Sequence, residues 1–211
     1  MLTAQKLYLL LTKDNGKPES AFTYSSCGYN AAVIADLMAA GRLELATGKH
    51  ATLKVIDAGL IADPLLAAAL QKLAGKDGKR LDSIIAMSSL CDMQLLVDSL
   101  AAAGIIEYGL RGFFGMGKPK TATANREAEA QIRAELKAAI HQQGAPAADS
   151  LQLLSILAGI DLLPGLLASE FAPMDKKQAK ARAQQLRQAS KLGQAAASAV
   201  STLNTVVFNA V

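Results

Sequence analysis

Apolar residues follow one another almost without interruption between Ala31 and Ala40, where Asp36 is the only charged residue. A segment that is apolar on every side belongs in a protein interior, and this one is too short to cross a bilayer, which takes about 20 apolar residues. Gly41 can take the left-handed conformation that ends a helix. The pattern predicts a buried central helix. Asp36 then needs hydrogen bonds from nearby backbone or from an arginine, because an unpaired buried carboxylate is costly.

The next residues alternate between polar and apolar positions on both sides of a short loop, the pattern of half-buried strands. We therefore predict that Arg42–Ala46 and Thr52–Ile56 pair as a β-hairpin. Asp63 followed by Pro64 is a strong signal for a helix start, because the acid caps the helix and proline suits its first turn. Other helices are expected to start at a Thr3 cap and to span Leu81–Met87 and Asp92–Ala103.

Residues 105–120 begin with alternating apolar and polar positions and continue with closely spaced glycines. This predicts a strand followed by turns, with Pro119 ending the pairing. From about Asn125 onward only helices are expected, and Asp149 is expected to cap an apolar helix that Pro164 interrupts. The predicted fold is mainly α, a single domain over all 211 residues, with helices packed around the central buried apolar helix and short β-hairpins.

The composition agrees with this fold, because 51% of the residues are hydrophobic and 19% are charged, enough for a sizeable core. The net charge of +4 allows an anionic partner without requiring one. Cys27 and Cys91 form no metal-ligand cluster, so free thiols in a reducing compartment are the simpler interpretation. The sequence shows no signal peptide and no membrane span. We expect a cytoplasmic protein that can bind peripherally to the inner face of a membrane.

No set of residues in the sequence suggests catalysis or a cofactor. His50 and His141 have no Cys, Ser or acid nearby at the spacing of a catalytic motif. Gly112–Lys118 fits Gly-x-x-x-x-Gly-Lys, most of a phosphate-binding loop, but Pro119 stands where that loop needs a Ser or Thr. We therefore predict a non-enzymatic protein with no cofactor and no bound metal.

The glycine-rich segment is better explained as an amphipathic hairpin. Three large apolar side chains lie at or near its predicted tip, flanked by cations, in a chain with only five phenylalanines. This combination suits a membrane interface, but the same residues could pack on the protein's own core or on a partner chain. The sequence leaves both interpretations open. The residues of this membrane hairpin are Arg111, Phe113, Phe114, Met116 and Lys118.

A second basic feature follows Asp175, which is expected to cap a helix. Residues 175–193 hold six Lys or Arg residues and one acid, so they carry +5 and the rest of the chain carries −1. If the segment is one helix, four of the cations fall within about 60° of one another. Such a stripe can bind phosphates, although it is more often a solvated face. The residues of this basic face are Lys176, Lys180, Arg187 and Lys191.

Leu81–Lys118 also has the outline of a winged-helix unit, which could bind DNA. The second helix of that unit would have to enter the major groove and donate hydrogen bonds to phosphates and base edges. From Ser88 to Ala103 that helix holds Asp92 and Asp98 and no Lys or Arg, which gives it the wrong charge. We take the similarity as architectural and predict no nucleic-acid partner.

Four segments of the chain are similar, in the same order, to segments of one known family. They are LYLLLTKDNGKP (7–18), AAVIADLMAAGRLEL (31–45), DPLLAAALQKL (63–73) and LLVDSLAAAGIIEYGLRGFFGM (95–116). They resemble the opening helix and turn, the apolar helix with its Gly-Arg-Leu-x-Leu motif, a later helix and the helix–hairpin segment of the Golgi phosphoprotein 3-like family. The C-terminal half matches only as helices. The chain looks like one of the compact bacterial members.

The resemblance implies a pocket for the headgroup of phosphatidylinositol 4-phosphate, which the family's eukaryotic members bind. That pocket uses a Trp and an Arg just before the central helix and two Arg on the helix before the hairpin. Asn30, Leu90 and Met93 stand at the Arg positions here, and with no Trp in the chain, Phe22 or Tyr24 is the nearest ring. Leu and Met cannot neutralise a phosphate, so we expect these five residues to form only a degenerate headgroup pocket.

Together these features predict a non-enzymatic peripheral membrane-binding or adaptor protein. Its hairpin and basic face would meet anionic lipid headgroups. The alternative is a soluble interaction module, in which the hairpin at 105–120 forms a homo-oligomer and no lipid is needed. The family's hairpin is implicated in both self-association and membrane contact, so the resemblance supports both. Hairpin tips that are buried between subunits cannot insert into a membrane, and this separates the two hypotheses.

Overall fold

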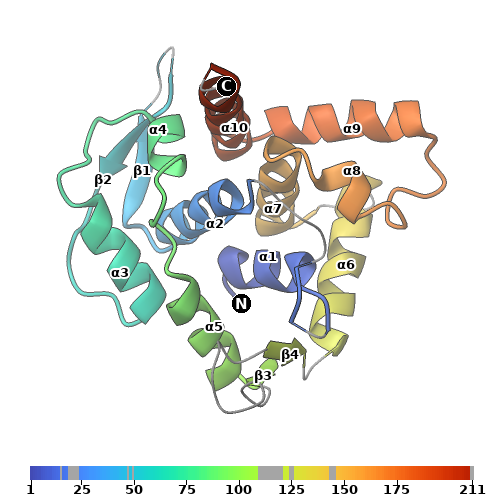
Figure 1. Ribbon diagram of the computed structural model, residues 1–211, viewed down its shortest axis with the longest axis horizontal. Coiled ribbons are helices and arrows are strands. Elements are labelled where there is room, and N and C mark those ends of the chain that lie inside the picture. Colours follow the sequence, from blue (N-terminus) through green and yellow to red (C-terminus); the bar gives the residue numbers. More distant parts are fainter. Residues whose placement is uncertain are drawn as a thin grey trace.

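The structure is a computed structural model that describes residues 1–14, 16–18, 24–46, 48, 50–108, 121–123, 126–142 and 146–209, with backbone only at 121–123 and 206–209. Helices dominate these residues and two antiparallel strand pairs complete them (Figure 1), which confirms the predicted mainly α fold with short β-hairpins. The helices are α1 (Thr3–Leu11), α2 (Ser25–Ala39), α3 (Pro64–Leu73), α4 (Leu81–Ile85), α5 (Met93–Ala102), α6 (Arg126–Ile140), α7 (Ala148–Gly159), α8 (Leu163–Leu166), α9 (Lys176–Gln188) and α10 (Lys191–Asn209). The strand pairs are β1 (Leu43–Ala46) with β2 (Thr52–Val55), and β3 (Ile106–Tyr108) with β4 (Thr121–Thr123).

Helix α2 is the buried centre that the apolar run predicts. Figure 1 shows it in the middle of the fold, close to α1 and α7. All of its residues from Cys27 to Leu37 are buried, which removes a large apolar surface from water. Gly41 has a φ of +69°, the left-handed conformation expected after the helix.

Asp36, the lone acid of this apolar run, closes the N-terminal end of α1. Its Oδ1 accepts the N–H of Thr3 at 2.7 Å, and its Oδ2 accepts the N–H of Ala4 at 3.0 Å. The first N–H groups of a helix have no partner within the helix, so these bonds satisfy the carboxylate and two donors together. The expected backbone partners of Asp36 are confirmed. Thr3 is the first helical residue, and Leu2 rather than Thr3 takes the cap position.

The first β-hairpin and helix α3 follow the sequence prediction closely. Strands β1 and β2 pair so that Leu43 and Leu53 are both buried in the core. Asp63 is the N-cap of α3, since its side chain accepts the N–H of Leu66 at 3.0 Å, and Pro64 lies in the first turn. Local sequence signals were sufficient here because cap, turn and strand pairing all involve residues close together in the chain.

The second strand pair has a different boundary from the predicted one. The sequence predicts that Pro119 ends the pairing, but β3 pairs with β4, which begins two residues after that proline. Proline removes one ladder donor at its own position, and this does not prevent a strand from forming beyond it. After residue 125 the described elements are helices, as predicted.

The apolar helix α7 also differs from its prediction at both ends. Ala147 takes the cap position, and Asp149 lies within the first turn, where its carboxylate accepts a hydrogen bond from Lys6 Nζ at 2.7 Å. The acid is thus paired with a lysine on α1. Helix α7 already ends at Gly159, and Pro164 lies in the first turn of α8 rather than interrupting α7.

Helices α7 and α10 cross at small residues. A Cβ added to Gly159 would lie 2.9 Å from the Cβ of Ala196 and closer still to the carbonyl oxygen of Gly193. A Cβ added to Gly193 would lie 2.5 Å from the carbonyl oxygen of Ser155. Only glycine permits backbones to approach this closely. The crossing therefore holds the start of α10 close against the C-terminal part of α7.

Candidate functional site

Two of the expected headgroup-pocket positions lie in the protein interior. Asn30 is 2% exposed, and its Nδ2 donates to the carbonyl oxygens of Ile85 at 2.9 Å and Met87 at 2.6 Å. Its Oδ1 accepts the N–H of Cys91 at 2.9 Å. Leu90, the residue before that donor, is fully buried. Asn30 therefore joins α2 to the segment between α4 and α5, and its polar atoms are already occupied.

The other three positions of that expected pocket have different surroundings. Met93, the first residue of α5, is 39% exposed. Tyr24 precedes α2, and its hydroxyl bonds to the side chain of Asn204 on α10. Phe22 lies outside the described residues. None of the five residues is basic, so an anionic headgroup at these positions would depend on cations from elsewhere in the chain.

The five residues of the membrane hairpin lie outside the described residues, in the connection 109–120. The strands at its base are described and pair in antiparallel register. Tyr108, at the end of β3, hydrogen-bonds through its hydroxyl to the carboxylate of Asp98 on α5. This bond raises the pKa of Tyr108 and lowers the pKa of Asp98. The base of the hairpin is thereby attached to α5.

The basic face is divided between two helices, which corrects the expectation of one continuous stripe. Helix α9 ends at Gln188 and α10 begins at Lys191. Between them Ser190 accepts the N–H of Gly193 on its Oγ at 3.1 Å, as an N-cap does, and donates its own hydroxyl to Ser155 Oγ at 2.9 Å. The signal that could have located the break is Ser190 itself, a favoured N-cap residue.

Arg182, one of the six cations of this segment, is engaged by the protein itself. Its Nε donates to the carbonyl oxygen of Ile140 at 2.9 Å, and its Nη2 donates to that of Ala139 at 3.0 Å. These carbonyls end α6, where a helix lacks donors and carries the negative end of its dipole. Burial lowers the pKa of Arg182. Arg182 therefore attaches α9 to the C-terminal end of α6.

The basic helix and the hairpin strands consequently lie at opposite ends of α6. Strand β4 precedes the first residue of α6, whereas Arg182 holds α9 at its last residues; Figure 1 shows β3 and β4 at the bottom and α9 at the upper right. A helix of 15 residues is about 22 Å long, and charges in physiological salt are screened over about 8 Å. A flat membrane against the outer side of β3 and β4 would thus lie beyond the screening distance from α9.

The cations of α9 line a groove that α7, α8 and α10 complete. Two hollows of about 470 and 480 Å³ are neighbours that share Asp161 and Arg187 in their linings, and we describe them together as one groove. Lys177 and Lys180 line the first hollow, and Val200 with other α10 residues lines the second. Among the described residues, no carboxylate lies within 4 Å of the Nζ of either lysine. We name this the α9–α10 groove.

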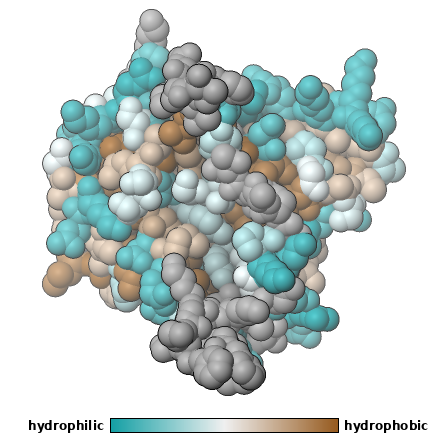
Figure 2. Space-filling view, in the orientation of Figure 1, coloured by the Kyte–Doolittle hydropathy of each residue, from teal (hydrophilic) through white to brown (hydrophobic). Residues whose placement is uncertain are grey.

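The α9–α10 groove includes only part of the predicted basic face. Lys180 and Arg187 line it, whereas Lys176 does not and Lys191 lines another pocket. Lys177 was missed by the stripe prediction, although its spacing of three residues from Lys180 places the two on neighbouring positions of a helix surface. In Figure 2, hydrophilic side chains project from the corner of the molecule that α9 occupies.

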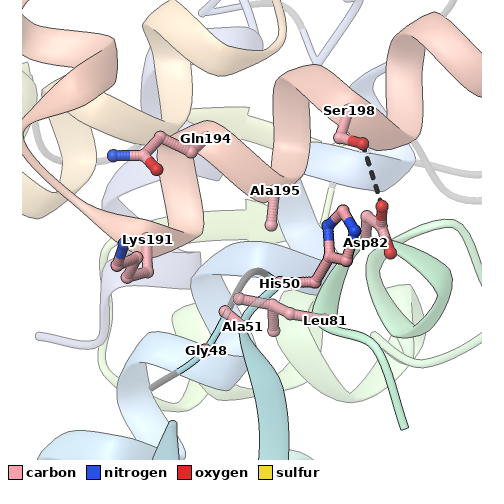
Figure 3. Close-up of a pocket in the computed structure, with 9 residues that line it drawn as sticks. All are labelled: Gly48, His50, Ala51, Leu81, Asp82, Lys191, Gln194, Ala195 and Ser198. Atoms are coloured by element: carbon pink, nitrogen blue, oxygen red, sulfur yellow. Dashed lines mark hydrogen bonds between the residues drawn. The ribbon is translucent and has the colours of Figure 1, made fainter. Parts of the chain in front are cut away.

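Lys191 lines a smaller pocket of about 120 Å³ beside the start of α10 (Figure 3). There the Asp82 carboxylate pairs with Arg80 at 2.5 Å and accepts the Ser198 hydroxyl at 2.9 Å, and the bond from Arg80 lowers the pKa of Asp82. Figure 3 shows His50 beside Asp82, whose carboxylate is bonded to Ser198. A nucleophilic serine needs a base, such as a histidine or a lysine, to accept its proton, whereas Ser198 donates to a carboxylate that is ion-paired with Arg80. The pocket therefore gives no support to serine catalysis.

Other titratable groups in the described part of the chain serve the structure. His141 Nε2 lies 2.9 Å from the carbonyl oxygen of Glu170. Cys27 and Cys91 are free, as predicted, and the structure shows that both are buried; burial raises the pKa of Cys91 to about 12, which keeps it a thiol at neutral pH. No cluster of three or more His, Cys, Asp or Glu among these residues could hold a metal ion. No described helix is long and apolar enough to span a bilayer.

Comparison with known protein families adds a finding that covers nearly the whole chain. A family model described as Golgi phosphoprotein 3 (GPP34) matches residues 3–203. The match therefore includes helices α7, α8 and α9. In the four-segment resemblance, this part of the chain matched the family only in being helical. No curated protein matches the chain.

Proposed function

Because the chain belongs to the Golgi phosphoprotein 3 (GPP34) family, we propose that it is a non-enzymatic, peripheral membrane-binding adaptor. The observation that carries the proposal is the register of β3 and β4, in which Ile106 pairs with Thr123 and Tyr108 pairs with Thr121. Residues 109–120 therefore connect two paired antiparallel strands. Apolar side chains beside cations in such a connection suit the headgroup boundary of a bilayer. That connection contains Arg111, Phe113, Phe114, Met116 and Lys118.

The proposed mechanism is insertion of apolar side chains combined with attraction between cations and anionic lipid. A specific phosphoinositide pocket forms no part of it, because Asn30 and Leu90 are buried and the polar atoms of Asn30 bond to backbone groups. Each cation near an anionic surface contributes on the order of 1 kcal/mol. Arg111 and Lys118 next to the apolar residues then provide the attraction, while the residues of α9 lie at the other end of α6.

Liposome co-sedimentation tests this proposal. The protein would be compared on neutral vesicles, on vesicles with anionic lipid, and on vesicles with phosphatidylinositol 4-phosphate at the same total charge, each at low and high salt. We expect binding to every anionic vesicle, weaker at high salt and lost in Phe113→Ser/Phe114→Ser. The matched control is Lys176→Glu/Lys180→Glu, which changes the net charge of the protein, unlike the hairpin variant, but does so on α9 at the other end of α6. We expect this control to retain binding.

Three results would contradict the proposal. Protein that stays in the supernatant with all vesicles would favour the interaction module, and light scattering after size exclusion would then test whether Phe113→Ser/Phe114→Ser dissociates an oligomer. A preference for the phosphoinositide at equal charge would indicate a specific headgroup pocket instead of general charge attraction. Loss of binding in the control but not in the hairpin variant would place the membrane contact on α9.

A further inference from the structure

We propose that the α9–α10 groove is a docking site for an acidic peptide segment of a partner protein. Its charge is the first argument. Among the described residues, Lys177, Lys180 and Arg187 line it against a single carboxylate, Asp161. In the described part of the chain, neither lysine has a carboxylate within 4 Å. These cations give the α9 side of the groove a positive potential, which attracts a ligand of opposite charge.

The length of the groove favours a peptide over a single phosphate group. The α9 side runs from Lys177 to Arg187, a rise of ten positions or about 15 Å along the helix. The α10 side of the second hollow runs from Ala197 to Thr205, about 12 Å. An extended peptide advances about 3.3 Å per residue, so the α9 side alone matches four or five residues. A phosphate would occupy a small fraction of this length.

The α9 side and the α7 side of the groove carry opposite charge, which also fits a peptide. Ala158 and Gly159 belong to the last turn of α7, where carbonyl groups give a helix a partial negative charge, and Asp161 adds a carboxylate. A multiply charged phosphate would be repelled there. A peptide offers backbone N–H donors to the α7 side and acidic side chains to Lys177 and Lys180. Small apolar residues such as Val200 leave room for the chain between the two walls.

The position of the groove gives such a partner access. It lies along α9, which Arg182 attaches to the C-terminal end of α6, whereas the hairpin strands lie at the other end of that helix (Figure 1). This argument rests on the proposed function, because it assumes that the hairpin contacts the membrane. A protein bound in that way would hold a lipid at one end and an acidic peptide at the other.

The test is an NMR titration of the ¹⁵N-labelled full chain with a peptide of about eight alternating Glu and Ala residues. The same peptide with Gln for Glu, inorganic phosphate, and small anionic vesicles serve as the other ligands. We expect the acidic peptide to shift the amide signals of Asp161, Lys177 and Val200 and to bind at least about tenfold more tightly than its Gln version, since the lysine contacts are electrostatic. Lys177→Glu/Lys180→Glu should weaken binding by about the same factor.

The matched control is Lys176→Glu/Lys191→Glu, which makes the same change in net charge outside the groove. Its binding should stay within about twofold of the unmodified chain, and unfolding curves of both variants verify their folding. Equal weakening by both variants, or shifts spread over other surfaces, would overturn the proposal. So would tighter binding of phosphate or vesicles at the groove. Phe113→Ser/Phe114→Ser should retain the peptide even if it loses membranes, so the two proposals can fail separately.

Discussion

The carboxylate of Asp36 in the buried helix α2 accepts the backbone N–H of Thr3 at 2.7 Å, across 33 positions of the chain. Burial raises the pKa of Asp36, and the N–H donors of Ala4 and Thr3 oppose that rise. The acid in the most apolar stretch of the sequence is thus an N-terminal cap for a different helix. It connects the two elements that lie deepest in the fold.

Replacing Asp36 by alanine is expected to destabilise the protein, because the N–H groups of Thr3 and Ala4 would be left buried and without an acceptor. The expected loss is about 1–3 kcal/mol in the free energy of unfolding for each group that no water reaches. Asp36→Asn keeps one acceptor and should lose less. Urea unfolding at neutral pH measures both. Glu44→Gln, on an exposed strand position, is the control and should change stability by less than about 0.5 kcal/mol.

Asn30→Leu should be among the more damaging substitutions, since Leu fills the volume but makes none of the three hydrogen bonds. The carbonyls of Ile85 and Met87 and the N–H of Cys91 would lose their partner, at about 1–3 kcal/mol for each buried group left unsatisfied. Thermal unfolding with Gln71→Leu, an exposed position on α3, as control measures the effect. Equal melting temperatures for the two variants would show that Asn30 does not hold α2 to the α4–α5 segment.

Gly193→Ala is expected to disturb the crossing of α7 and α10. The new methyl group would meet the carbonyl oxygen of Ser155 at 2.5 Å, and backbone cannot yield as a flexible side chain can. The expected loss is about 1–3 kcal/mol, the usual cost of overpacking. Gly165→Ala is the matched control, because nothing lies within 4 Å of its Cβ, and it should be neutral or stabilise by up to about 1 kcal/mol. Denaturant unfolding of both compares them directly.

Lys6→Met should reduce stability in a way that depends on pH. The hydrogen bond from Lys6 lowers the pKa of Asp149 below its ordinary 3.8, so the pair stabilises the fold above that pH and loses its effect as Asp149 protonates at lower pH. The pKa of Lys6 is raised: burial lowers it, but the bonds and charges of Asp149 and Glu135 outweigh that effect. The contribution is therefore also lost as the pH rises above 10.5.

Urea midpoints at pH 7, 5 and 3 test this expectation. The difference between the unmodified chain and Lys6→Met should be full at pH 7 and 5 and should shrink at pH 3. A difference that stays constant over this range would mean that the aliphatic stem of Lys6, rather than its charge, stabilises the fold. Lys54→Met, whose partner Glu44 is largely exposed, should show little effect at any of these pH values.

Most of the correct predictions came from patterns of residues that lie close together in the chain. The apolar run around Asp36 identified the central helix, Asp63 and Pro64 identified the start of α3, and Asp175 identified the start of α9. These signals are reliable because caps, turns and helical periodicity depend on neighbours within a few positions. The ordered set of such segments was also sufficient to indicate the family.

The candidate site depended on contacts that no local pattern contains. The stripe prediction treated Lys180 and Lys191 as one face, because nothing in the helical period shows that Ser190 begins a new helix. Arg182 was included only in the charge count of residues 175–193, and its spacing gave no sign that the side chain reaches carbonyls 42 and 43 positions away. The alignment of Asn30 with a ligand-binding position of the family did not reveal that its side chain makes three hydrogen bonds to backbone groups in the protein interior.

The sequence by itself determined where the central helix, the first hairpin and the start of α3 form, that Asp36 needs buried partners and which cations are present, because these follow from residue type and short-range spacing. The tertiary structure alone decided which partners they have and which way they face. In the tertiary structure the N–H of Thr3 donates to Asp36, and Lys177, Arg187 and Val200 line the α9–α10 groove. Helix α9 contacts the end of α6 that is far from the hairpin strands. Packing and hydrogen bonds between distant segments fix these relations, and sequence spacing does not encode them.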